Sequence, residues 1–118
     1  MKLINRSAFS LLPKQPFADW ANNLAADELN APMTLADHRR EASVYMVDEF
    51  QDETDISRLL QQHFAAMFEN ELAAWDEFGD DWPAERGFDA FQQWFDVTPQ
   101  VIAVDLSAQP LMLAPLTD

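Results

Sequence analysis

The chain has 118 residues and no cysteine, which excludes disulfides, thiolate metal sites and cysteine nucleophiles. Hydrophobic residues make up 48% and aromatic residues 12% of it, a composition unlike that of acidic disordered chains. We therefore expect a single acidic domain over residues 1–118. Pro13 ends the short apolar stretch near the N-terminus, so neither a signal peptide nor a membrane span is predicted.

The net charge of -14 is confined to one part of the sequence. Residues 1–42 carry five bases and five acids, whereas residues 43–118 carry sixteen acids and two bases. Such a surface repels phosphate backbones and anionic membranes, and it attracts basic protein surfaces. We therefore expect a basic protein partner, without direct nucleic-acid or membrane binding. A cytoplasmic location is expected because neither a signal peptide nor a membrane span is predicted.

The first part of the chain predicts a strand, a helix, a helical turn and a second strand. Residues 3–12 can form the first strand, and Pro16 suits the first turn of a helix over residues 16–26. Thr34 with Asp37 resembles a capping pair that opens a brief helical turn through residue 40. The β-prone residues 43–47 predict a strand that ends near residue 50.

A long helix is the clearest predicted element. Its start is indicated by acidic residues at 52, 53 and 55, because acids complement the positive end of a helix dipole. Large apolar residues then recur every three or four positions for about five turns. They are Ile56, Leu59, Leu60, Phe64, Met67, Phe68, Leu72 and Trp75. This stripe predicts the centre of the core.

The last part of the chain predicts a second helix and a third strand. Pro83 breaks the chain, residues 88–95 have helical spacing, and Thr98-Pro99 is expected to end this helix. The apolar run 101–104 is typical of a strand covered on both faces. The resulting order β-α-β-α-α-β predicts an α+β fold, with a three-stranded sheet packed against a single layer of about three helices.

Five short motifs resemble a family of small bacterial proteins that has no assigned activity. They are Asn5-Arg6-Ser7-Ala8, Lys14-Gln15-Pro16-Phe17 with Asp19-Trp20, Phe68-Glu69 with Glu71-Leu72, Trp82-Pro83, and Trp94-Phe95-Asp96-Val97. The resemblance spans most of the chain. It implies a bacterial cytoplasmic domain, and it implies no catalytic or binding residues.

His63 and Glu71 are the candidate residues for a pocket. Helical spacing places His63 on or beside the apolar face of the long helix, with Glu71 two turns further on. A histidine and a carboxylate on one face can form a metal site or an acid–base pair, but a packed, hydrogen-bonded histidine explains the position as well. No zinc motif and no phosphate-binding glycine motif is present, so we predict no metal and no cofactor.

The segment 69–89 is the candidate docking surface, because it holds eight acids and one base with aromatic residues between them. Exposed aromatics can anchor a partner while carboxylates steer its Lys and Arg residues. The predicted partner-binding residues are Trp75, Asp76, Glu77, Phe78, Asp80, Asp81, Trp82 and Glu85. The competing interpretation is that these aromatics belong to the core and the acids only keep the surface soluble.

These patterns favour a non-enzymatic interaction or regulatory module that binds a basic partner. The alternative is a small ligand- or metal-binding domain, or an enzyme, with its pocket around His63. A further alternative is mimicry of nucleic acid, in which carboxylates imitate phosphates. The sequence predicts no oligomeric state.

Overall fold

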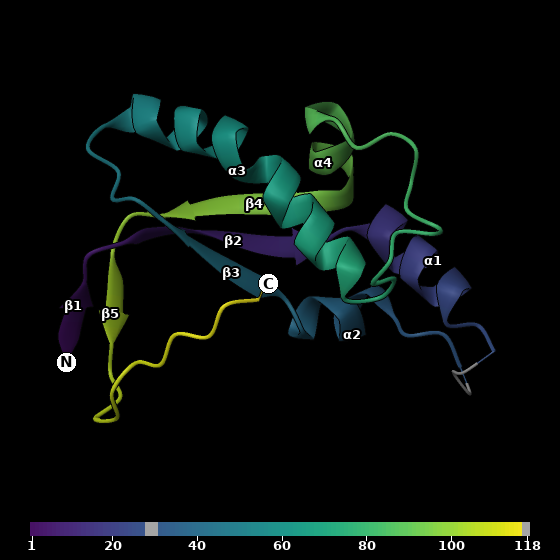
Figure 1. Cartoon of the computed structure of the whole chain (residues 1–118), viewed down its shortest axis with the longest axis horizontal. Coiled ribbons are helices and arrows are strands. Elements are labelled where there is room, and N and C mark those ends of the chain that lie inside the picture. Colours follow the sequence, from purple (N-terminus) through teal and green to yellow (C-terminus); the bar gives the residue numbers. More distant parts are fainter. Residues whose placement is uncertain (28–30, 117–118) are drawn as a thin grey trace.

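The computed structural model describes residues 1–27 and 31–116 and has an α+β fold, as predicted. Its elements are β1 (Lys2–Ile4), β2 (Ser7–Pro13), α1 (Gln15–Leu24), α2 (Leu35–Arg40), β3 (Ser43–Val47), α3 (Glu53–Ala73), α4 (Phe88–Trp94), β4 (Phe95–Gln100) and β5 (Ala103–Asp105). They form a three-stranded sheet in the order β3-β2-β4 and a separate two-stranded ribbon, β1-β5 (Figure 1).

Both pairings of the three-stranded sheet are antiparallel, with β2 in the centre. Phe9 of β2 lies opposite Tyr45 of β3 and Pro99 of β4. Side chains alternate between the two faces of a strand, so Phe9 and Leu11 point to the same face, and both are fully buried. Val44 and Met46 of β3 point to the opposite face and are exposed. The core therefore lies on one side of the sheet.

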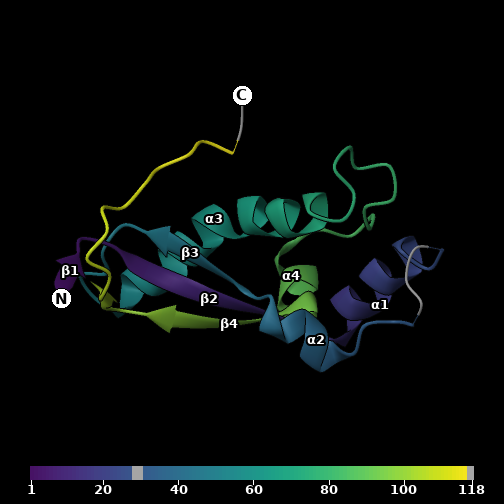
Figure 2. The ribbon, with the colours of Figure 1, turned by 90° about the horizontal axis from the view of Figure 1, so that it is seen from below.

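Helix α3 covers that side of the sheet (Figures 1 and 2). It begins after Asp52, whose side chain accepts hydrogen bonds from the backbone N–H groups of Thr54 and Asp55. Such a cap satisfies donors that have no partner inside the helix. The predicted apolar stripe is confirmed, because its members are buried or pack against the buried core.

The core under α3 is rich in aromatic rings. The ring centroid of Phe68 lies 5.5 Å from that of Phe95 and 5.9 Å from that of Phe91, both of which are buried. Phe17 of α1 extends this cluster, at 5.3 Å from Phe95. Tilted and edge-on aromatic pairs at these distances contribute roughly 0.5–1.5 kcal/mol each beyond the burial of their area. The cluster ties the short helices α1 and α4 to the centre of α3.

Helices α1 and α2 pack at the end of the sheet where β2 finishes (Figures 1 and 2). The predicted capping pair at the start of α2 is confirmed: the Asp37 N–H donates to Thr34 Oγ1, and the Thr34 N–H donates to the Asp37 carboxylate. These bonds hold the pKa of Asp37 below its usual value. The helical turn is thus a short helix that brings His38 and the following strand β3 to this end.

The first strand is divided, which the apolar pattern did not predict. Residues 3–12 were expected to form one strand, but Asn5 and Arg6 separate β1 from β2. Strand β1 pairs with β5 in the exposed ribbon, whereas β2 is the central strand of the sheet. The pairings of β1 with β5 and of β2 with β4 each join chain segments more than 80 residues apart. Local sequence patterns do not predict contacts over such a separation.

Two predictions about the last part of the chain are wrong. Thr98-Pro99 does not end the second helix, because α4 stops at Trp94 and Thr98-Pro99 lies inside β4. Proline is tolerated there because β4 is an edge strand. The run 101–104 is not a buried strand either: Ile102 is 70% exposed, and only residues from Ala103 onward pair, with β1. A strand formed by residues 101–104 could not join the sheet beside β2, because β3 and β4 occupy both edges of β2.

Candidate functional site

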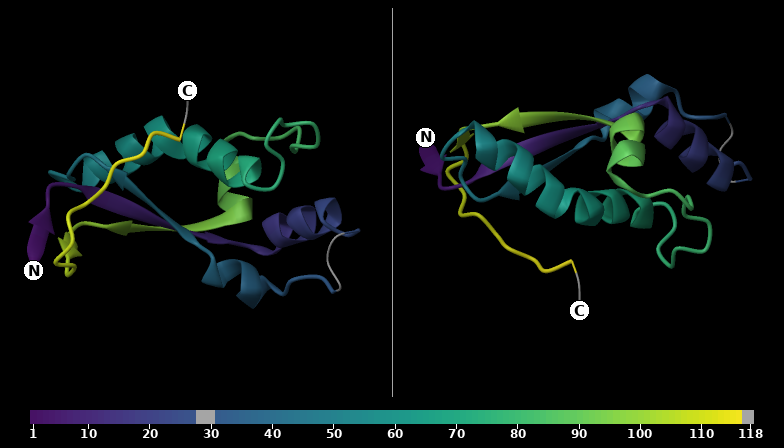
Figure 3. Two further views of the ribbon diagram at one scale, coloured as in Figure 1. Left: turned by 60° about the horizontal axis from the view of Figure 1, so that its bottom comes forward. Right: turned by 90° about the horizontal axis from the view of Figure 1, so that it is seen from above.

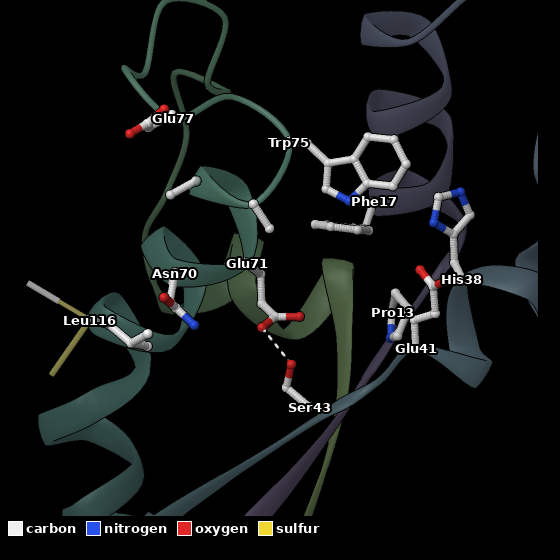
Figure 4. A pocket seen from close by; sticks show the side chains of 12 residues that line it. Pro13, Phe17, His38, Glu41, Ser43, Asn70, Glu71, Trp75, Glu77 and Leu116 are labelled. Atoms are coloured by element: carbon white, nitrogen blue, oxygen red, sulfur yellow. Dashed lines mark hydrogen bonds between the residues drawn. The ribbon is translucent and has the colours of Figure 1, made fainter. Parts of the chain in front are cut away.

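A cavity of about 540 Å³ lies where α1, α2, β3 and the end of α3 meet, and we call it the first cavity (Figure 4). Capping of α2 and the short connection to β3 bring one wall into place, and the last turn of α3 brings the other. The cavity is lined by Pro13, Phe17, His38, Glu41, Ser43, Asn70, Glu71, Ala73, Ala74, Trp75, Glu77 and Leu116.

Glu71 of α3 reaches strand β3 at the wall of the first cavity. Its Oε2 atom accepts hydrogen bonds from Ser43 Oγ, at 2.9 Å, and from the Tyr45 hydroxyl, to which Asn70 Nδ2 also donates at 2.9 Å. Burial and the bond to Glu71 raise the pKa of Tyr45 well above its usual value, so it remains a neutral donor. Both bonds converge on Oε2, whereas no hydrogen bond to Oε1 is found within residues 1–27 and 31–116, and this second oxygen lies toward the cavity (Figure 4).

His38 closes the aromatic side of the cavity. It is buried, and its ring lies 5.5 Å from that of Trp75 and 6.2 Å from that of Phe17 (Figure 4). Asn22 exchanges two hydrogen bonds with the Met33 backbone, which orients its Oδ1 to accept from His38 Nε2 at 3.1 Å. Burial lowers the pKa of His38 below its usual value, although Glu41 and Asp37 act in the opposite direction. The ring is therefore neutral near pH 7.

The first cavity combines acidic side chains with an aromatic wall. Glu41, Glu71 and Glu77 line it, and none of its described lining residues is Lys or Arg. The ion pairs among described residues use other carboxylates, those of Asp37, Asp55, Asp96 and Asp105. Carboxylates beside an aromatic face attract ammonium and guanidinium groups. The cavity thus has the chemistry of a receptor for a cationic side chain.

A second cavity, of about 520 Å³, adjoins the first between β3 and the middle of α3. It is lined by Tyr45, Met46, Val47, His63, Ala66, Met67, Glu69, Asn70, Ala73, Trp82 and Leu116. The two candidate pocket residues are thus in different cavities, because His63 lines the second and Glu71 the first. Within residues 1–27 and 31–116, no hydrogen bond joins them. Residues 63–71 of α3 separate the two side chains by about two helical turns.

The predicted docking segment 69–89 spans the end of α3, the loop that follows it and the start of α4, and we call the loop residues 75–87 the acidic loop. Asp76 organises it, since its Oδ2 accepts from the Asp81 N–H at 2.7 Å and its backbone oxygen accepts from Trp82 Nε1 at 2.8 Å. Trp20 of α1 donates through Nε1 to the Asp81 carbonyl at 2.9 Å, which ties the loop to the body. Gly79 has φ 77°, a left-handed conformation that side chains disfavour.

The structure separates the aromatic residues of the acidic loop into two kinds. Trp75 and Trp82 are half-buried and pack against the core, as the competing interpretation expected for them. Phe78 is 83% exposed. Its neighbours Glu77, Asp80, Asp81 and Glu85 are exposed as well, and Asp76 is half-buried. The loop therefore exposes one aromatic ring together with four acidic side chains.

Several lining residues were not among the sequence candidates. His38 of α2, Glu41 at the C-cap of α2 and Ser43 of β3 come close to Glu71 only in the folded chain, whereas Asn70 precedes Glu71 on α3. No local spacing identifies them, although Glu41 and Ser43 follow directly after a recognisable capped helix.

The described part of the chain contains no cluster of three or more His, Asp or Glu side chains arranged to hold a metal ion. Within the same residues, no helix combines the length and apolar character needed to cross a membrane. Comparisons with protein-family models, curated proteins and solved structures found no match. The resemblance to small bacterial proteins therefore stays a prediction.

Proposed function

We propose that this chain is a non-enzymatic binding module for a basic segment of a partner protein, with one Lys or Arg side chain of that segment entering the first cavity. The observation that carries the proposal is the cavity's lining of three carboxylates and an aromatic wall without a basic residue among its described members. A cation placed there meets Glu41 and Glu71, with the Trp75 ring beside it.

The acidic loop supplies the rest of the proposed interface. Trp75 and Glu77 belong both to this loop and to the cavity, so the two form one continuous surface. Phe78 offers an exposed aromatic anchor of the kind that concentrates binding energy at interfaces. The exposed carboxylates of the same loop would accelerate encounter with a positively charged partner and make binding sensitive to salt.

The hydrogen bonds in the cavity favour a binding role over catalysis. Ser43 donates to a carboxylate, and within the described residues no hydrogen bond links it to either histidine. The base that it does contact, the Glu71 carboxylate, uses the same oxygen to accept from the Tyr45 hydroxyl, so that oxygen is engaged in positioning two donors. The Glu71 network instead holds one carboxylate oxygen in place and leaves the other facing the cavity.

The test is quantitative affinity capture from the native cell extract with matched variants. Glu41→Gln with Glu77→Gln removes two carboxylates from the cavity, and Glu49→Gln with Glu53→Gln makes the same charge change at exposed positions outside the cavity lining. We expect a basic partner that the wild type and the control retain in a stoichiometric amount. The cavity variant should retain at least several-fold less of it.

Two results would contradict the proposal. One is equal capture of the same partner by both variants, which would assign binding to general acidity. The other is capture of nucleic-acid-binding proteins in proportion to net charge alone, which would favour mimicry of nucleic acid.

A further inference from the structure

The C-terminal segment 106–116 differs from the acidic chain that precedes it. It contains no charged residue, although the whole chain has a net charge of -14. Its large apolar side chains are all exposed: Leu106, Leu111, Met112, Leu113 and Leu116, with Leu113 at 95%. Soluble proteins rarely expose apolar side chains so densely unless they bind something. The segment therefore has the character of an apolar ligand.

The second cavity has the character of its binding site. Strand β3 is an edge strand of the sheet, and the cavity lies between this edge and helix α3. Its walls include Val47 of β3, Ala66 and Met67 of α3, and the ring of Trp82. Apolar clefts of several hundred Å³ at such junctions are typical binding sites.

The end of the segment already lies at this site. Leu116 lines both cavities while remaining 85% exposed, so it touches the opening without filling it. The segment leaves β5 and runs along the side of the molecule formed by β3 and α3 (Figures 1 and 3). Eleven residues from Asp105 to Leu116 span at most about 36–40 Å, so small rotations along it can bring other apolar residues inward.

We infer that segment 106–116 is a strap that folds back on its own chain and inserts apolar side chains into the second cavity. The occupant is the segment of the same molecule, because a tether holds it near its site at a millimolar effective concentration. A second copy approaches against the repulsion of two molecules that each carry -14.

The strap also regulates the first cavity, an extension that rests on the proposed function. Leu116 contacts the lining of both cavities, so a closed strap covers the entrance used by the partner's cationic side chain. Partner binding then requires the strap to open. Affinity should accordingly increase when the strap is held away.

The absence of cysteine makes a direct test simple. Leu116→Cys is combined with Ala66→Cys, which lines the second cavity, or with Ala65→Cys, an exposed neighbour that does not. Disulfides form only when the two Cα atoms come within about 4.4–6.8 Å of each other. Mild oxidation of a dilute sample is followed by mass spectrometry and by non-reducing electrophoresis, after circular dichroism has confirmed that both variants are folded.

We expect the Ala66→Cys pair to form an intramolecular disulfide at least tenfold faster than the Ala65→Cys pair. Equal rates would overturn the inference, because they indicate a freely moving segment. Preferential formation of disulfide-linked dimers would overturn it as well and would assign the groove to a second copy.

The regulatory extension is tested on the same oxidised protein. Binding of the peptide acetyl-Gly-Arg-Gly-amide is compared before and after reduction of the disulfide. We expect reduction to strengthen binding several-fold. Equal binding in both states would overturn regulation by the strap. It would not affect the inference that the strap docks, which the disulfide rates test separately. Absence of binding in both states would count against the proposed function alone.

Discussion

His38 is the residue whose burial has the clearest consequence for stability. Its lowered pKa means that, as the pH falls below about 6.5, the unfolded chain takes up a proton that the folded chain does not. The contribution of neutral His38 to the stability of the fold is thus fully present above about pH 6.5 and decreases as the pH falls toward the lowered pKa of the folded state. The Asp37 and Glu41 carboxylates reduce the effect without reversing it.

Chemical denaturation at pH 7.5 and 5.5 measures this effect. The wild type should lose stability between these values, and His38→Gln should lose less because it removes the titrating group. His63→Gln is the matched control: it leaves the buried His38 in place and should retain the loss. An unchanged pH dependence in His38→Gln would show that other groups cause the loss.

The residues of the first cavity also show what sequence reasoning could not reach. Glu71 was identified from its place on the long helix, but its partners Ser43 and Tyr45 are 28 and 26 residues away. His38 lies within the helical turn predicted to run through residue 40, and nothing in that turn points to the cavity. A site assembled from four separate elements has no periodic signal, so its members became visible only in the folded chain.

At the scale of elements, the N-cap of α3 is the most sharply testable feature. Asp52 Oδ1 accepts from the Thr54 N–H at 2.9 Å. Asp52→Ala should lower the free energy of unfolding by about 1 kcal/mol, within the usual range of about 0.5–2 kcal/mol for loss of a cap. Asp52→Asn also removes the charge but keeps an acceptor oxygen, so it should lose much less.

Urea denaturation distinguishes the two variants, since loss of a cap lowers the midpoint at constant slope. Equal losses for Asp52→Ala and Asp52→Asn would assign the effect to charge rather than to the hydrogen bond.

Helices were predicted from sequence more successfully than strands. The capped helices α2 and α3 carry their own start signals and apolar spacing, which act within one turn. Strand β4 was missed because Thr98-Pro99 looked like a stop signal, although Phe95 and Val97 alternate with exposed Asp96 and Thr98. That alternation was the available evidence for a strand. The pairing of β1 with β5 depends on distant segments and had no local signal.

At the scale of the whole molecule, charge and apolar surface are separated. The acidic loop and the first cavity carry carboxylates without ion-pair partners among the described residues, whereas the segment 106–116 carries no charge. This separation favours two kinds of contact on adjoining cavities: a cationic side chain in the first and an apolar strap in the second. In the proposed function, long-range charge would bring a basic partner close, and the shape of the first cavity would then select the side chain.

The most direct test of the account is a titration of ¹⁵N-labelled protein with acetyl-Gly-Arg-Gly-amide, beside the neutral acetyl-Gly-Gln-Gly-amide. We predict saturable shifts from the arginine peptide only, centred on Ser43, Glu71 and the Trp75 indole. They should be strongly weakened by Glu41→Gln with Glu77→Gln and preserved by Glu49→Gln with Glu53→Gln. Shifts that fail to saturate, or that spread evenly over the acidic surface, would contradict the assignment of the first cavity as a receptor for a basic side chain.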